Sequence, residues 1–480
     1  MSNINNQTTT SLDSAELKKL WATENLPDGT LSIKRYKGTD TDIVIPDIID
    51  KKKVTAISEE AFAFDYSDTS ASRAFNKTLQ KIRSVTIPNT VTHIGDGAFR
   101  NCISLQRVVI PDSIESLGWN VFEECKDLVY TNYDKGRYLG NEANPYVVFF
   151  KTTSKAMTSC EIHPDTKIIA GRAFQKCSRI KEINIPEGVK DIGDQAFWEC
   201  KSLVKVVFPN SLKQIGSAGP YCWSEDFGVE CVMYDNALYV GNRENPHLLL
   251  LRAVNEEITS CKISDKTRFI YSYAFRNCKS LASIIIPDSV IDIGALAFEG
   301  CSLLKNIELT DSIVSIGYSA FSECTSLTSI TLPNHLEDLE GYLFHECTAL
   351  ESIVIPDSVQ SIGGSAFQNC TALESIVIPD SVRSIGDSAF KNCTALESIV
   401  IPDSVRRIGS FAFENCTALK SVIMGKSVKE IGTGAFRKCE NLINITFLGY
   451  SRAITYWDSA FDDCPLLSKE ITDKMHRIGC

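Results

Sequence analysis

The sequence contains few residues suited to acid–base or metal chemistry. Only six histidines occur among 480 residues, and no two have a spacing such as H-x3-H. Zinc sites usually need C-x2-C pairs, and the chain has none. Glycine-rich phosphate loops and the Gly-x-Ser-x-Gly elbow are also missing. We therefore expect no catalytic residue, no bound metal and no cofactor, and an enzyme is the least favoured class.

Positive charge and long apolar runs are scarce as well. The formal net charge is −11, whereas a nucleic-acid-binding protein needs Lys and Arg to neutralise phosphates. No run of about 18 apolar residues occurs, as a transmembrane helix would require. Residues 1–10 are polar and do not resemble a signal peptide. We expect no nucleic-acid partner, no membrane insertion and a cytoplasmic location, with unconventional export left open.

What the sequence does contain is a repeat marked by its 18 cysteines. From Cys278 to Cys439, eight cysteines follow one another at intervals of 23 residues, and the phrase LESIVIPDSVQSIGGSAFQNC (350–370) recurs around them. A unit this short cannot bury its apolar side chains alone, so neighbouring units must stack. The sequence therefore predicts one elongated solenoid in place of several globular domains.

Each part of the unit predicts a local structure. Apolar residues alternate with polar ones over 350–355, which is typical of a strand with one buried face. Pro356 ends that strand because it has no N–H to donate. Gly363 suits a turn with positive φ, and residues 365–370 read as one short helical turn. The unit as a whole is expected to be α/β.

The cysteine column is best interpreted as a row of small buried apolar residues. Helical turns on neighbouring coils are expected ~8–10 Å apart, too far for a disulfide, which needs Cα atoms ~4.4–6.8 Å apart. Unpaired cysteines in this number suit a reducing compartment. Cys222, Cys231 and Cys480 fall outside the regular units and are expected to be the more reactive thiols.

The stack of repeats is expected to have a cap at its N-terminal end and two inserts that interrupt it. A helix is predicted over about 14–23, and extended segments over 31–36 and 43–45. Two further segments match each other at a displacement of 101 residues and contain Gly-Asn and Asn-Pro turns between apolar runs. These β-hairpin inserts either widen the sheet or contact a partner. The expected organisation is a helix and β cap (1–53), repeats (54–128) with a loop at 65–77, a β-hairpin insert (129–170), repeats (171–231), a second insert (232–270), repeats (271–467) and a C-terminal tail (468–480).

These units resemble the BspA-type leucine-rich repeat family, whose unit reads roughly L-x-x-I-x-I-P-x-x-V-x-x-I-G-x-x-A-F-x-x-C. The likeness extends from about Val54 to Leu467. It implies a right-handed superhelical stack with short strands, short helical turns and a sheet along one side. It also implies a role in protein recognition or adhesion, since many relatives are cell-surface or secreted proteins.

The outward face of the predicted strand column is the candidate binding site. Small serines stand beside β-branched residues on it, and an open apolar stripe often marks an interaction site. The same pattern also arises from β-propensity alone. A row of glutamates along the edge could attract a basic partner. The outward residues are Ser352, Val354, Ser375, Val377, Ser398, Val400, Ser421 and Ile423, and the edge residues are Glu351, Glu374 and Glu397.

The sequence thus favours a non-catalytic scaffold that recognises a protein partner through this face. The competing interpretation is a cell-surface or secreted adhesin that binds host or matrix proteins.

Overall fold

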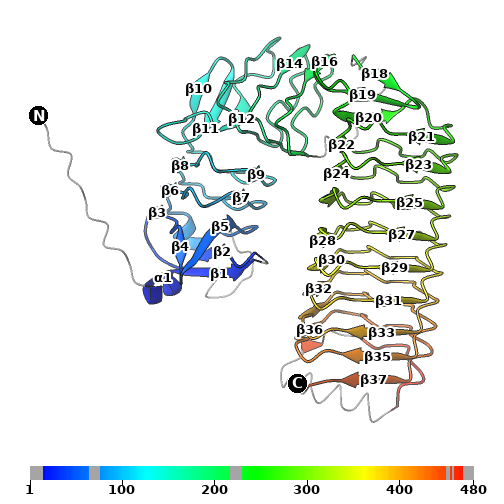
Figure 1. Cartoon of the computed structure of the whole chain (residues 1–480). Helices are drawn as coiled ribbons and strands as arrows, with labels where there is room; N and C mark the ends of the chain where they lie inside the picture. Colours follow the sequence, from blue (N-terminus) through cyan, green and yellow to red (C-terminus); the bar gives the residue numbers. More distant parts are fainter. Residues whose placement is uncertain are drawn as a thin grey trace, which may run out of the picture. The chain divides into compact units, whose positions relative to one another are not determined.

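The computed structural model describes residues 14–26, 28–63, 76–216, 230–449, 455–456 and 459–468, and most of its regular structure is short β-strands (Figure 1). The chain divides into two units, Met1–Val229 and Glu230–Cys480. Both contain the repeat as a stack of coils. None of the described helices is long and apolar enough to cross a membrane.

The N-terminal unit begins with a β cap that leads into the repeats. The helix predicted over 14–23 ends earlier, because Trp21–Asn25 pairs antiparallel with Leu31–Tyr36 and becomes a strand. The extended segment predicted at 31–36 is confirmed. The elements are α1 (Ser14–Leu20), β1 (Trp21–Asn25), β2 (Leu31–Tyr36), β3 (Asp42–Val44), β4 (Ile48–Ile49), β5 (Lys52–Ile57), β6 (Ser84–Thr86), β7 (His93–Ile94), β8 (Arg107–Val109), β9 (Ser116–Leu117), β10 (Thr131–Tyr133), β11 (Gly136–Leu139), β12 (Val148–Thr152), β13 (Ile168–Ile169), β14 (Glu182–Asn184), β15 (Asp191–Ile192), β16 (Lys205–Val207) and β17 (Gln214–Ile215).

The C-terminal unit contains the most regular coils, each with a three- or four-residue first strand and a two-residue second strand. Its apolar core is continuous from Ala237 to Ala460. The strands are β18 (Val232–Tyr234), β19 (Ala237–Val240), β20 (Leu249–Ala253), β21 (Ser260–Lys262), β22 (Phe269–Ile270), β23 (Ser283–Ile285), β24 (Asp292–Ile293), β25 (Asn306–Glu308), β26 (Ser315–Ile316), β27 (Ser329–Thr331), β28 (Asp338–Leu339), β29 (Ser352–Val354), β30 (Ser361–Ile362), β31 (Ser375–Val377), β32 (Ser384–Ile385), β33 (Ser398–Ile401), β34 (Arg407–Ile408), β35 (Ser421–Met424), β36 (Glu430–Ile431), β37 (Asn444–Phe447) and β38 (Thr455–Tyr456).

The first strands of the C-terminal unit pair in parallel within three sheets, β21–β23, β25–β31 and β33–β37, with equivalent residues side by side. In β29 and β31, Ser352 lies opposite Ser375 and Val354 opposite Val377. The second strands form their own parallel ladder, as in the sheet from β28 to β38. Because the register equals the repeat length, every side chain stands beside its own counterpart in the next coil.

The helical turn predicted over residues 365–370 is wrong. Ser365 and Asn369 have positive φ values of 56° and 64°, which a right-handed helix does not tolerate. The N–H groups of Ser365, Phe367 and Asn369 donate to carbonyls of the next coil at 2.8–2.9 Å, whereas those of the residues between them donate three positions back. Hydrogen bonds between coils thus replace those of a helix.

The predicted α/β class is corrected for the same reason. In the described part of the chain, helix is limited to α1 and residues 76–79. The fold is a β-solenoid of stacked coils resembling leucine-rich repeats. Of the loop predicted at 65–77, residues 65–75 lie outside the described residues. Residues 76 and 77 begin the short helix at 76–79. The tail predicted at 468–480 lies outside them from residue 469 onward.

Two antiparallel strand groups lead into the repeats. β10, β11 and β12 pair antiparallel, and β12 then pairs parallel with β13. β18, β19 and β20 do the same, and β20 pairs with β22. Each group therefore joins the ladder of second strands within its own unit.

Candidate protein-binding face

The first strands of the C-terminal unit leave a column of apolar side chains open to solvent, as the alternation predicted. Val354 and Val377 are each 79% exposed, Val400 is 53% exposed and Ile423 is 36% exposed, whereas Ile353 between the outward positions of β29 is buried. β29 pairs in register with β31, and β33 pairs in register with β35. Because β31 also contacts β33, these side chains follow one another along the column of first strands. We call Val354, Val377, Val400 and Ile423 the valine stripe.

The serines beside the valine stripe become less exposed to solvent toward the C-terminal end of the stack. Ser352, Ser375 and Ser398 are exposed, but Ser421 is half-buried. The widest open surface on the predicted face is therefore at β29 and β31.

Acidic side chains stand at both ends of these strands. Glu351 and Glu374 precede β29 and β31, and Asp357 and Asp380 follow them; all four are exposed. Within the described ranges, none of the four has a Lys or Arg at ion-pair distance. Only the glutamate row was predicted from the sequence, and this second acidic row was not.

Lysines neutralise the acidic rows farther along the array. Glu397, predicted to attract a basic partner, pairs with Lys420 at 2.9 Å. Asp403 pairs with Lys426 at 2.6 Å, and the hydrogen bond from this lysine lowers the pKa of Asp403. The negative potential available to a partner therefore lies mainly at β29 and β31.

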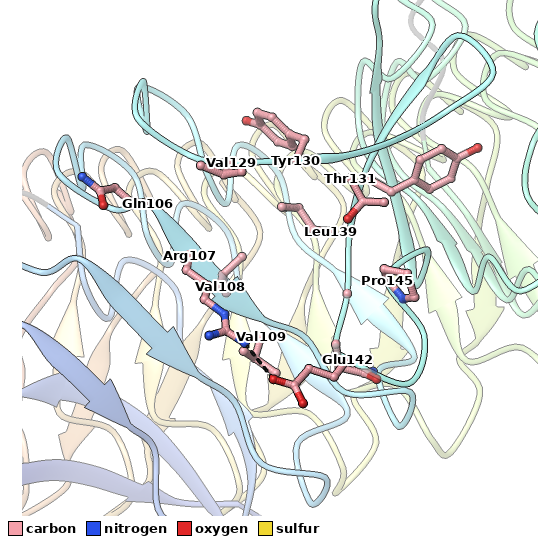
Figure 2. Close-up of a pocket in the computed structure, with 13 residues that line it drawn as sticks. Gln106, Arg107, Val108, Val109, Val129, Tyr130, Thr131, Leu139, Glu142 and Pro145 are labelled. Carbon is pink, nitrogen blue, oxygen red and sulfur yellow. Dashed lines mark hydrogen bonds and ion pairs between the residues drawn. The ribbon is translucent and has the colours of Figure 1, made fainter. Parts of the chain in front are cut away.

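A pocket in the N-terminal unit is an alternative candidate site. It measures about 470 Å³ and lies between β8 and the antiparallel strands β10 and β11. Arg107 and Glu142 form an ion pair of 3.3 Å in its lining (Figure 2). Val108 and Leu139 are buried in its wall, and Val129 is exposed at its edge. The pocket combines apolar walls with one ion pair and holds no nucleophile beside a base.

Two carboxyls are buried at equivalent positions of the duplicated segments. Asp191 and Asp292 are 101 residues apart, and burial raises the pKa of each to about 7. The Leu117 N–H donates to Asp191 Oδ2 at 3.2 Å. Because both carboxyls are enclosed by packed coils, we assign them a structural role.

In the part of the chain that the structure describes, no group of three or more His, Cys, Asp or Glu could hold a metal ion.

The cysteine column is buried as predicted, but the reason given against disulfides was wrong. Hydrogen bonds join neighbouring coils at this segment, so the coils stand at the ~4.8 Å spacing of a β-ladder instead of ~8–10 Å. The cysteines that the structure describes are all free. From Cys301 to Cys439, each thiol of the regular column instead donates to a Phe carbonyl of the preceding coil, as Cys370 Sγ does to Phe344 at 3.1 Å. Cys222 and Cys480 lie outside the described residues.

We expect the column thiols to resist alkylation in the folded protein. Burial raises the pKa of Cys416 to about 12, so almost no thiolate forms at pH 8. Cys464 is half-buried, and a hydrogen bond with Cys439 lowers its pKa. Iodoacetamide at pH 8 should label Cys464 at least tenfold faster than Cys416, as measured by mass spectrometry. In urea the two rates should converge; equal rates in the folded protein would contradict the assignment.

Comparison with known proteins places these coils among leucine-rich repeats. Residues 68–143, 147–225, 254–374 and 362–480 match the model of the BspA type leucine rich repeat region. The chain is 27% identical to a leucine-rich repeat protein of Bacteroides ovatus, covering 88% of this chain and 92% of that one with a TM-score of 0.37. It is 25% identical to a leucine rich cell surface protein of Faecalibacterium prausnitzii, covering 90% and 93% with a TM-score of 0.32. No curated protein matches the chain.

Proposed function

We propose, because this chain belongs to the BspA-type leucine-rich repeat family, that it is a non-catalytic scaffold that binds a protein partner through the valine stripe. The observation that carries the proposal is the exposure of Val354 and Val377, whose side chains are both 79% open to solvent on adjacent strands. Contiguous exposed apolar surface of this kind is typical of binding sites.

The charges around the stripe indicate the chemistry of the partner. At β29 and β31 the stripe runs between two acidic rows, so a segment that complements it there carries an apolar row with Lys or Arg on both sides. An amphipathic basic helix has this pattern. Its pitch of ~5.4 Å is close to the ~4.8 Å spacing of the strands, so a helix along the column presents about one apolar residue to each coil. We take such a helix as the occupant.

The proposal is tested with a synthetic basic amphipathic helix as the probe. A fluorescent peptide with a leucine stripe flanked by lysines should bind the full-length protein, as measured by anisotropy. Replacing Val354 and Val377 together with Lys should weaken binding at least tenfold, since the change removes apolar contact and adds like charge. Circular dichroism should stay unchanged because both positions are exposed.

The control is Val314→Lys, an exposed valine outside the first-strand column. Regular coils carry Gln360, Arg383 or Arg406 at this position, so the fold tolerates a polar side chain there. The control should bind the peptide within twofold of the unmodified protein. Equal loss in both variants, or equal binding of a peptide with Glu in place of Lys, would remove the valine stripe as the site.

A further inference from the structure

A second pocket of the N-terminal unit, about 260 Å³ in volume, is lined by a cluster of cations. Lys151 and Lys155 come from the end of the antiparallel group, and Arg172 comes from the first turn segment that follows β13. One carboxylate, Glu123, also lines the pocket. The lining therefore carries a net positive charge in a chain whose overall charge is −11.

Arg172 is held in a fixed orientation. Its guanidinium carbon lies 4.0 Å from the centre of the Trp119 ring, and its Nε donates to Gln195 Oε1 at 3.3 Å. Stacking on the ring and the hydrogen bond at Nε leave the two terminal amino groups available to an anion. A guanidinium that is already oriented loses little entropy when it binds an oxyanion through two hydrogen bonds.

Lys151 is half-buried among other cations. Its Nζ lies 4.7 Å from the centre of the Tyr130 ring, and the Arg137 guanidinium lies 5.8 Å from the same ring. Burial, followed by repulsion from Arg137 and Lys155, lowers the pKa of Lys151. Among residues with a described position, no carboxylate lies within ion-pair distance of Lys151, Lys155, Arg172 or Arg137. A bound anion would relieve this repulsion.

The duplicated segment shows that the fold does not need these cations. At a displacement of 101 residues, the second antiparallel group keeps the same strand pairing. It retains a cation only at the position of Lys151. The counterparts of Arg137, Lys151, Lys155 and Arg172 are Leu238, Arg252, Glu256 and Tyr273.

We propose that this pocket of the N-terminal unit binds a phosphate group, either free or carried on a larger molecule. A phosphate group has about −1.5 to −2 charges at neutral pH and three strong acceptor oxygens. The Arg172 guanidinium offers a planar pair of donors, and the two lysines add point charges at the sides of the pocket. This site is independent of the valine stripe, which lies in the other unit.

The test is calorimetric titration of the full-length protein, in chloride buffer, with inorganic phosphate and with phenyl phosphate. Saturable binding at one site is expected. Arg172→Gln and Lys155→Glu, the latter introducing the residue of the second copy, should each weaken binding at least tenfold. Arg252→Gln is the matched control and should stay within twofold of the unmodified protein. Tighter binding of phenyl phosphate indicates a phosphate carried on a larger molecule; equal binding indicates free phosphate.

A second measurement does not depend on the variants. Because its pKa is lowered, Lys151 should react with an amine reagent faster than exposed lysines at pH 8, and phosphate should protect it. Absence of saturable binding to the unmodified protein would overturn the proposal. So would an Arg252→Gln variant that binds as weakly as Arg172→Gln, or an unchanged rate of Lys151 labelling when phosphate is added.

Discussion

Replacing Gly363 with alanine should destabilise the repeat array, while the same change at the adjacent Gly364 should have little effect. A Cβ at Gly363 would stand 2.5 Å from the backbone nitrogen of Gly341, whereas at Gly364 the nearest atom, the Asp387 carbonyl oxygen, is 3.4 Å away. The coils cannot separate easily, because the Gly363 N–H donates to the Leu339 carbonyl at 2.7 Å. Forcing an extra carbon into packed backbone typically costs about 1–3 kcal/mol, and the 2.5 Å approach to backbone places Gly363→Ala toward the upper end of that range.

Urea unfolding followed by circular dichroism measures this difference. Gly364→Ala should stay within about 0.5 kcal/mol of the unmodified protein or gain slightly, because alanine reduces the entropy of the unfolded chain. Hydrogen exchange should show faster exchange in β28, β30 and β32 for Gly363→Ala alone. Equal midpoints for the two variants would mean that the coils can move apart. The same close approach recurs at Gly294, Gly317, Gly386, Gly409 and Gly432.

The reason why glycine is required at the Gly363 position could not be predicted from the sequence of one repeat. The repeat predicted that Gly363 is needed and gave positive φ as the reason. Positive φ instead occurs at Ser365 and Asn369, and the glycine is required by the approach of the neighbouring coil. The pattern Ser-Ala-Phe-x-x-Cys was predicted to be a helical turn for the same reason. The sequence of one repeat does not show that carbonyls of the next coil accept the hydrogen bonds of this segment.

The candidate face was predictable to a similar extent. Alternation within the strand identified Val354 and Val377 as outward, and their exposure confirms it. Neutralisation of Glu397 by Lys420 could have been found as well, since the two are 23 residues apart and therefore adjacent in a stack. The proposed phosphate pocket could not be predicted, because the repeat pattern does not describe how the antiparallel group folds. That fold brings Lys151 and Arg172 to the lining of one pocket.

Replacing Phe367 with alanine should divide the C-terminal unit into two cooperative blocks. The Phe367 ring is fully buried and stacks between Phe344 and Phe390, with ring centres 5.5 Å and 5.2 Å away. Removing a buried phenylalanine costs about 3–5 kcal/mol, and each coil contacts only its neighbours. The loss should therefore fall on the coils around the cavity and leave distant coils unaffected.

Hydrogen exchange and urea unfolding together distinguish this outcome from general destabilisation. Protection should fall most in β29 to β32 and least in β22 and β24, and the urea transition should broaden because the coils on the two sides of the cavity no longer unfold together. Gln368→Ala, at the adjacent half-buried position, should leave both measurements nearly unchanged. A uniform loss of protection from β22 to β36 would show that the stack unfolds as one block, and that its stability is not a sum of contacts between neighbouring coils.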